Sequence, residues 1–279
     1  MSTDLREKII KIISNDINNE ISSSRRVSGF ILAGLPGTGK THIGLSLANM
    51  FEKMYFIQCR EGISDDNLLR EIWLDDNGSP IVKKGKLITA AKQAAAGQKV
   101  LLIIDELDKS RLSVDYLFLE ILQNEIISGD NEDIIIKNGK GYLCIIFTTN
   151  EKRRISEPLL RRCRFFRVKF PERNEEVKRI LEIAKINNNH LAAVSAANFF
   201  VSIASKVRDI QNLYKYPSSY ELGIALRDLI LGVLSAEDFL NVLSPDPDDQ
   251  RRIREKFNWN TLSYLEGMLK GWSEWGGSS

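Results

Sequence analysis

Eight consecutive residues constrain this chain more than any other feature of its sequence. They match the pattern GxxxxGK[ST] in full and read Gly34-Leu35-Pro36-Gly37-Thr38-Gly39-Lys40-Thr41. The match directly follows the apolar run Phe30–Ala33 and opens the helical pattern Thr41–Phe51, and by chance it would occur in about one chain in a hundred of this composition. Glycines let successive backbone N–H groups turn inward, and a helix N-terminus adds positive potential. The arrangement therefore predicts a loop that binds phosphate groups.

The last two residues of the pattern carry side chains suited to a nucleotide. We expect Lys40 to reach the β and γ phosphates and the Thr41 hydroxyl to ligate Mg²⁺.

Short apolar runs divide the first 170 residues, and each is nearly continuous, as is typical of strands covered on both faces of a parallel sheet. The runs are Phe30–Ala33, Tyr55–Cys59, Val100–Ile104, Tyr142–Thr148 and Phe165–Phe170. Helical patterns at Thr41–Phe51, Lys86–Ala96 and Val114–Ile127 alternate with them. This alternation predicts an α/β three-layer sandwich with a parallel sheet and right-handed crossovers.

The pattern changes after Pro171, where no strand-like run is found among three helical patterns: Glu175–Ile186, Leu191–Val207 and Ser219–Leu234. We therefore expect an N-terminal helix at 1–26, an α/β nucleotide-binding domain at 27–171, a small all-α domain at 172–245 and a C-terminal extension at 246–279. Between Asp130 and Tyr142, the apolar Ile134–Ile136 followed by Asn138-Gly139 predicts a short hairpin.

Composition excludes several classes of protein. The 279 residues are 43% hydrophobic and 27% charged, which is typical of a globular chain. The net charge of +2 is too small to attract nucleic acid or a membrane surface by itself. The cysteines Cys59, Cys144 and Cys163 form no CxxC pair and only two histidines accompany them, which argues against structural zinc and a disulfide framework. No apolar stretch approaches the ~18 residues of a membrane span. We expect a soluble, cytoplasmic protein with no membrane partner.

Two carboxylates and an amide follow two of the apolar runs. Asp105 and Glu106 end the run that begins at Val100, and Asn150 ends the run that begins at Tyr142. At the carboxyl edge of a sheet, beside a phosphate loop, Asp105 is suited to Mg²⁺ and Glu106 to acting as general base on the attacking water. Asn150 would orient that water, although asparagine after a strand is also a common loop cap.

A basic run follows, in which eight of the eighteen residues from Lys152 to Lys169 are Lys or Arg. It contains Leu160-Arg161-Arg162-Cys163. A solvated basic face and a nucleic-acid contact are both open interpretations of this run.

These motifs, in this order and before a helical region, resemble the AAA+ ATPases over about the first 170 residues. The resemblance implies ATP and Mg²⁺ as cofactors, a helical lid, and a homo-oligomeric ring, usually a hexamer. It also implies that the strand ending in Asp105 neighbours the phosphate-loop strand. Arg162 matches the arginine finger that completes a neighbouring subunit's site, with Arg161 as the alternative. The implied nucleotide-binding set is Gly34, Pro36, Gly37, Thr38, Gly39, Lys40, Thr41 and His42.

Finer features resemble the MoxR branch of that family. They are Ile57–Gly62, Gly85–Ile88 and the Ile134–Tyr142 hairpin. In this branch the segment around Trp73 carries a substrate-facing element, although packing is an equal explanation for this tryptophan. The helical lid would carry a sensor arginine where this chain has Tyr220; either Arg227 substitutes for it or the sensor arginine is absent.

The leading interpretation is an ATP-hydrolysing ring that remodels or assembles a protein partner, which in the MoxR branch is often of von Willebrand A type. The alternative is a nucleic-acid-associated AAA+ loader or helicase-like motor, favoured only by the basic run. A protein that binds ATP without hydrolysing it is disfavoured by the joint presence of Glu106, Asn150 and Arg162, and a GTPase by the lack of an NKxD motif.

Overall fold

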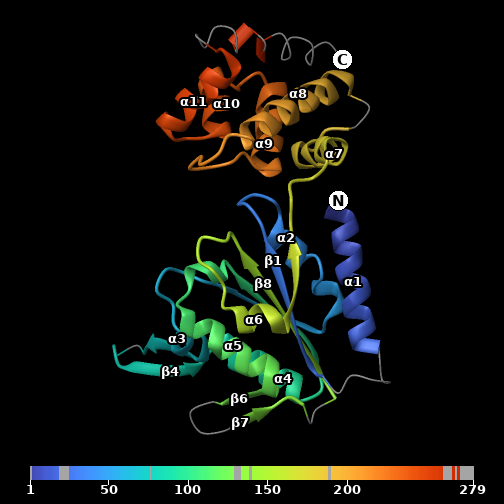
Figure 1. Ribbon diagram of the computed structural model, residues 1–279. Coiled ribbons are helices and arrows are strands. Elements are labelled where there is room, and N and C mark those ends of the chain that lie inside the picture. Colours follow the sequence, from blue (N-terminus) through green and yellow to red (C-terminus); the bar gives the residue numbers. More distant parts are fainter. Residues whose placement is uncertain are drawn as a thin grey trace. The chain divides into compact units, whose positions relative to one another are not determined.

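The computed structural model describes residues 2–18, 25–75, 77–128, 133–137, 140–187, 190–259, 266–267 and 269–270. The chain forms two compact units (Figure 1). The α/β unit comprises residues 2–34 and 39–168, and the helical unit comprises the loop residues 35–38 and the chain from residue 169.

A parallel sheet of five strands forms the centre of the α/β unit, in the order β2-β5-β8-β1-β9. Its strands are β1 (Val27–Ala33), β2 (Lys53–Gln58), β5 (Lys99–Asp105), β8 (Tyr142–Thr149) and β9 (Cys163–Arg167). The predicted α/β sandwich with a parallel sheet is thereby confirmed.

The strand order corrects one expectation. The strand that ends in Asp105 is not the neighbour of the phosphate-loop strand, because β8 lies between β5 and β1 and pairs with both. The side chains at the end of β8 therefore stand between the carboxylates of β5 and the phosphate loop.

Helices cover both faces of this sheet. They are α1 (Ser2–Asn18), α2 (Lys40–Leu45), α3 (Asp65–Leu69), α4 (Lys86–Ala95), α5 (Leu112–Asn124) and α6 (Glu157–Arg162), with 3₁₀ turns η1 (Ala48–Met50) and η2 (Leu107–Lys109).

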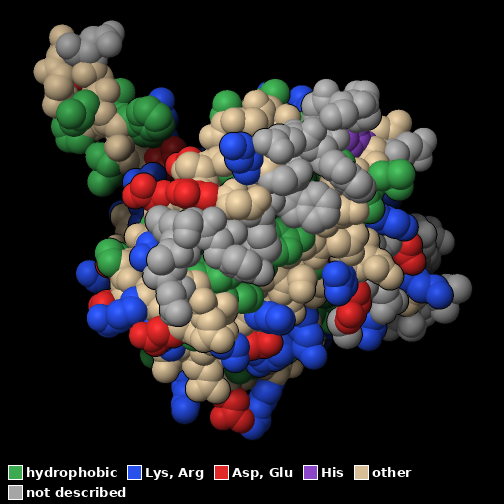
Figure 2. Space-filling model, turned by 90° about the horizontal axis from the view of Figure 1, so that it is seen from above, with side chains coloured by type: hydrophobic (Ala, Val, Ile, Leu, Met, Phe, Trp, Pro, Cys, Tyr) green, Lys and Arg blue, Asp and Glu red, His purple; other side chains and the backbone are tan. Residues whose placement is uncertain are grey.

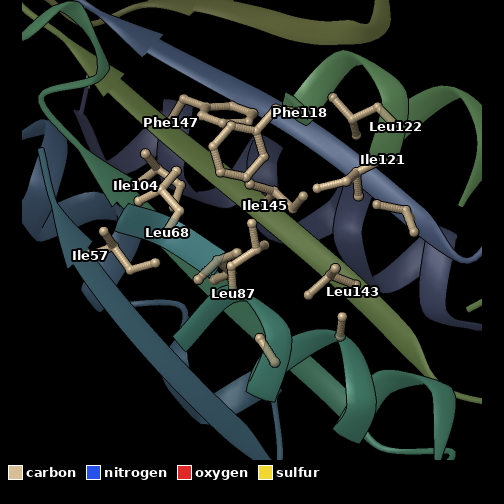
Figure 3. Close-up of a cluster of buried hydrophobic side chains, with 14 of the residues drawn as sticks. Ile57, Leu68, Leu87, Ile104, Phe118, Ile121, Leu122, Leu143, Ile145 and Phe147 are labelled. Carbon is tan, nitrogen blue, oxygen red and sulfur yellow. The ribbon is translucent and has the colours of Figure 1, made fainter. Parts of the chain in front are cut away.

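Alternation along each central strand produces two separate hydrophobic cores. In β5, Leu102 and Ile104 face the core that α4 and α5 cover, whereas Leu101 and Ile103 face the core that α1 and α2 cover. Figure 3 shows the first of these cores, with Phe118 of α5 edge-on against Phe147 of β8. This two-sided burial explains why the strands are apolar without interruption, and it confirms the three-layer arrangement.

Two antiparallel hairpins branch from the α/β unit. The first consists of β3 (Arg70–Leu74) and β4 (Pro80–Lys84), and Asp75 holds its turn by accepting hydrogen bonds from the N–H groups of Asn77 and Ser79 at 2.9 and 2.7 Å. Its large apolar side chains are 42–73% exposed: Ile72, Trp73, Leu74, Ile81 and Val82. Figure 2 shows green side chains gathered on a projection at the left of the view, the side on which β4 lies in Figure 1.

The second hairpin differs from the predicted one. Its strands are β6 (Ile126–Ser128) and β7 (Asp133–Ile135), so Ile134 and Ile135 pair with the preceding segment and not with the strand at Tyr142. The predicted turn residues Asn138 and Gly139 lie outside the described residues.

In its described part, the helical unit contains α7 (Arg173–Ala184), α8 (Leu191–Arg208), α9 (Ser219–Ile230), α10 (Ala236–Leu243) and α11 (Pro247–Phe257), and a hydrophobic core joins them. The first three confirm the predicted helical patterns. Ile253 of α11 lies in the same core, beyond the limit expected at residue 245; the domain limits themselves remain a prediction. No helix in the described parts of the chain is both long and apolar enough to span a membrane.

Candidate nucleotide site

The glycine loop has the backbone that its sequence predicts. Gly37 and Gly39 have φ angles of 79° and 91°, a backbone conformation that residues other than glycine rarely adopt. The loop starts from a fixed point, because the Gly34 N–H donates to the carbonyl of Thr149 at the end of β8 (3.2 Å). Thr38 closes a turn through its hydroxyl, which donates to the Leu35 carbonyl at 2.9 Å. Pro36 and Gly37 are exposed on the outside of this turn.

Lys40, at the start of α2, folds back over its own loop. Its ammonium donates to the Gly34 carbonyl at 2.8 Å, and the residue is only 6% exposed. Burial lowers the pKa of Lys40 from 10.5 to about 8, although the carboxylates of Asp108, Asp105 and Glu106 act in the opposite direction. An anionic ligand in the loop would stabilise this buried charge.

Asp105 connects the phosphate loop to the sheet. The residue is 6% exposed, and its Oδ1 accepts hydrogen bonds from the hydroxyls of Thr41 (2.6 Å) and Thr148 (2.8 Å). A hydroxyl and a carboxylate are hard oxygen ligands of the kind that Mg²⁺ takes beside phosphate oxygens and water. Thr41 and Asp105 thus fit the Mg²⁺ site predicted for them; within the described residues, no group of three or more His, Cys, Asp or Glu could hold a metal.

Glu106 follows with an unusual backbone. Its φ of 56° is in the left-handed region, and its N–H donates to the Thr148 hydroxyl at 2.9 Å. Nδ2 of Asn150 donates to Oε1 of Glu106 at 3.3 Å, so the structure brings the candidate base and the candidate water-orienting amide together. A non-glycine residue in this region costs about 1–3 kcal/mol and is typical of functional sites.

Three side chains that support this arrangement escaped the sequence analysis. Asp108, 6% exposed, accepts hydrogen bonds from the N–H groups of Asn150 (3.1 Å) and Lys152 (3.0 Å) and so holds the loop after β8. Arg153 makes a bidentate ion pair with the fully buried Asp115 (3.0 and 2.8 Å). The one signal for Asp108 in the sequence is its position three residues after Asp105, because a third carboxylate so close to the phosphate loop needs a structural reason.

The two arginines on α6 have different surroundings. Arg161 forms an ion pair with Glu157, one turn earlier on the same helix. Arg162 instead donates a long hydrogen bond to the amide oxygen of Gln123, at 3.4 Å in the last turn of α5. Both line an open hollow of about 490 Å³ that also contains Leu119 and Pro158. The structure thus does not bring Arg162 to Glu106 of its own chain.

Three other predicted residues are exposed in the structure. His42 is exposed on α2, directed away from the buried side of that helix. In the helical unit, Arg227 is exposed in the last turn of α9 and Tyr220 is exposed in its first turn.

The comparisons with known proteins agree with this geometry. Residues 29–163 match the family model described as an AAA domain of the dynein-related subfamily. The mitochondrial Lon protease homolog of Scheffersomyces stipitis is 32% identical over 189 residues, which are 65% of this chain and 16% of that protein. The Lon protease of Chlamydia muridarum is 28% identical over 174 residues, 59% of this chain and 20% of that protein. The chain therefore spans a fifth or less of the length of each of these two Lon proteins.

Solved structures also resemble the chain. A closed-state cryo-EM reconstruction of Hsp104 with ATPγS and FITC casein has a TM-score of 0.56 at 16% identity, covering 83% of this chain and 46% of that one. With the sheet order and the glycine loop, these likenesses show that the chain has the α/β fold of the AAA+ ATPases, with an AAA-like domain in residues 29–163 and an all-α region after it.

Proposed function

We propose that this chain is a Mg²⁺-dependent, MoxR-like ATPase that acts as a hexameric ring and remodels a protein partner. One observation carries the proposal. At one edge of the sheet, Thr41 of the phosphate loop is hydrogen-bonded to Asp105 at the end of β5, and Asn150 after β8 is hydrogen-bonded to the next carboxylate, Glu106. Lys40 lies beside them, bonded to the Gly34 carbonyl of its own loop.

Each side chain in this group has a distinct task. Lys40 and the loop N–H groups would hold the β and γ phosphates, while Thr41 and Asp105 would hold Mg²⁺, which when bound offsets charge on the phosphate oxygens. Glu106 accepts a proton from the attacking water, whose oxygen bonds to the γ phosphorus as the bond to the β–γ bridging oxygen breaks. Asn150, whose Nδ2 donates to Oε1 of Glu106 at 3.3 Å, is placed to orient that water beside the base.

The arginine finger of a ring supports the same proposal. Arg162 has no carboxylate partner among the described residues, whereas Arg161 is already paired with Glu157. A guanidinium that bonds only an amide is the better candidate for a neighbour's γ phosphate, so we assign the finger to Arg162 and keep Arg161 as the control.

The basic run favours protein over nucleic acid as partner. Of its eight basic residues, four are held in ion pairs: Arg153 with Asp115, Arg161 with Glu157, Arg164 with Asp16 and Arg167 with Glu151. A phosphate backbone is bound by unpaired lysines and arginines, so this pairing weakens the case for the nucleic-acid-associated alternative. The exposed apolar hairpin β3–β4, with Trp73, is the surface that we assign to the protein client.

The location and the partner class complete the proposal. All three cysteines are free thiols, compatible with a reducing cytoplasm. A von Willebrand A-type protein is the partner class that the MoxR resemblance implies.

The test is ATP hydrolysis by the full chain with Mg²⁺, with and without DNA. Lys40→Ala should abolish ATP binding, and Glu106→Gln should bind ATP but hydrolyse it at least about a hundredfold more slowly. The matched control is Glu120→Gln, because Glu120 is exposed on α5. This variant should hydrolyse ATP normally. Tight ATP binding by Lys40→Ala would contradict the loop assignment, and DNA-stimulated hydrolysis would favour the alternative function.

A mixing experiment tests the ring. Arg162→Ala and Glu106→Gln should each be inactive alone, and a mixture should regain activity because one variant supplies the intact base and the other the intact finger. Arg161→Ala should remain active on its own. Failure of the mixture to recover would count against a finger supplied by a neighbouring subunit.

A further inference from the structure

Glu106 is held by two side chains of different charge. The amide of Asn150 donates to Oε1 at 3.3 Å, and the ammonium of Lys109 lies 2.6 Å from Oε2. The first is a long hydrogen bond from a neutral donor, whereas the second is a short ion pair. A bond between two charged partners is the stronger of the two, so Lys109 dominates the orientation of this carboxylate.

The backbone cannot relieve this restraint. The Glu106 N–H is bonded to the Thr148 hydroxyl, and its φ of 56° is a conformation that the surrounding bonds impose. Lys109 ends the turn η2 three residues later, and its N–H donates to the Glu106 carbonyl at 2.9 Å. Only the two side chains are left to rearrange.

Lys109 stays charged, and more than one carboxylate attracts it. The hydrogen bond to Glu106 raises the pKa of Lys109, so the ammonium is charged wherever an ATPase would be assayed. The carboxylates of Asp108 and Glu61 attract it as well. Because the Lys109 side chain is 31% exposed and that of Glu106 is 22% exposed, the pair can exchange partners without local unfolding.

We propose that Lys109 is a positioning residue that restrains Glu106, turning its carboxylate toward η2 until the ion pair loosens and Oε2 becomes free to receive the proton of water. This inference rests on the proposed ATPase function. In the resting chain Lys109 would inhibit hydrolysis by restraining Glu106. Removal of the Lys109 charge should therefore speed the chemical step, whereas removal of an ordinary structural residue would slow it.

Single-turnover hydrolysis of ATP tests the inference, because with the protein in excess the rate reports chemistry and not product release. Lys109→Met keeps an unbranched side chain, one heavy atom shorter, and removes the charge; we expect its rate constant to rise roughly three- to tenfold. The affinity for ATP should be unchanged. Lys109→Arg can still pair with Glu106 and should behave like the unmodified chain.

Lys53→Met is the matched control. Lys53 is exposed at the amino end of β2, at the opposite end of the strand from the site, and its loss should change neither rate nor affinity. Circular dichroism and the oligomeric state of each variant at the assay concentration confirm that folding and assembly are equal.

The outcomes separate the two proposals. If the unmodified chain hydrolyses ATP, Glu106→Gln does not, and Lys109→Met is as slow as or slower than the unmodified chain, the restraint is wrong while the ATPase function stands. The restraint is equally wrong if Lys109→Arg is accelerated as much as Lys109→Met. If neither the unmodified chain nor Lys109→Met hydrolyses ATP, the proposed function fails and the restraint fails with it.

Discussion

Lys40 carries its charge in a place where water cannot fully stabilise it. Its pKa of about 8 means that the ammonium is protonated below this pH and neutral above it in the nucleotide-free chain. A triphosphate is fully ionised in the same range and attracts only the protonated form. We therefore expect the affinity for ATP to fall by about 25-fold between pH 7.5 and 9.5, as titration calorimetry would measure.

The matched variant for this experiment is Lys40→Arg, which stays charged throughout the range. Its affinity, even if weaker at pH 7.5, should be nearly independent of pH. An equal fall in both proteins would show that a group other than Lys40 controls the pH dependence.

At the same scale, the sequence predicts residues with a direct chemical task better than those that position them. Lys40, Thr41, Asp105 and Glu106 stand out because each belongs to a short pattern with a known physical role. Asp108 bonds a segment more than forty positions away, and no spacing in the sequence reports such a partner.

Three elements end at other residues than the sequence pattern predicts, because hydrogen bonds or strand pairing override the pattern. The helix predicted at Val114–Ile127 ends at Asn124, because Glu125 turns to φ 56° and its carboxylate accepts hydrogen bonds from the N–H groups of Arg26 and Val27. The helix predicted at Thr41–Phe51 ends at Leu45, where the Ser46 hydroxyl bonds the Ile43 carbonyl. The strand predicted at Phe165–Phe170 begins at Cys163 and ends at Arg167, because its partner β1 ends at Ala33.

The buried ion pair between Arg208 and Glu176 joins α7 and α8, and Glu176 also accepts a hydrogen bond from the Ser219 hydroxyl at the start of α9. Two guanidinium nitrogens donate to the carboxylate at 2.8 Å, and two further bonds reach the Pro217 carbonyl. Arg208→Met would leave Glu176, 1% exposed, charged and without its main partner. We expect urea unfolding to show a loss of about 3–5 kcal/mol in the free energy of unfolding.

The double variant Arg208→Met/Glu176→Leu provides the control. Because it removes both charges, it should be no less stable than Arg208→Met alone. If the losses in free energy of unfolding from the two substitutions add in the double variant, the two residues stabilise the unit independently.

The β3–β4 hairpin allows a functional prediction for an element that contributes little to the core. Trp73 is 54% exposed, so Trp73→Ala should change stability by no more than about 0.5 kcal/mol. If the hairpin contacts the client, stimulation of ATP hydrolysis by an unfolded protein such as casein should fall severalfold, whereas Trp73→Phe should retain it. Ile135→Ala, on the other hairpin and 40% exposed, is the matched control; an equal loss there would contradict a specific role for β3–β4.

At the scale of the whole molecule, the chain supplies every part of the proposed site except the charge that faces the γ phosphate from outside. Lys40, Asp105, Glu106 and Asn150 are brought together within one α/β unit, whereas Arg162 bonds Gln123 near the end of α5. An arginine finger contributes about 10³–10⁵ in rate in related phosphoryl transfer. An isolated chain should therefore bind ATP well and hydrolyse it poorly.

The proposed function therefore predicts that hydrolysis depends on assembly. The rate per chain should rise more than about tenfold from nanomolar to tens of micromolar protein and then level off, while ATP affinity changes little. Arg162→Ala should remain slow at every concentration, and Arg161→Ala should follow the unmodified chain. Light scattering in the same samples must show the oligomer forming over the range in which the rate rises. A rate per chain that is high and constant down to the monomer would mean that one chain completes its own site, and the ring would then have no part in the chemistry.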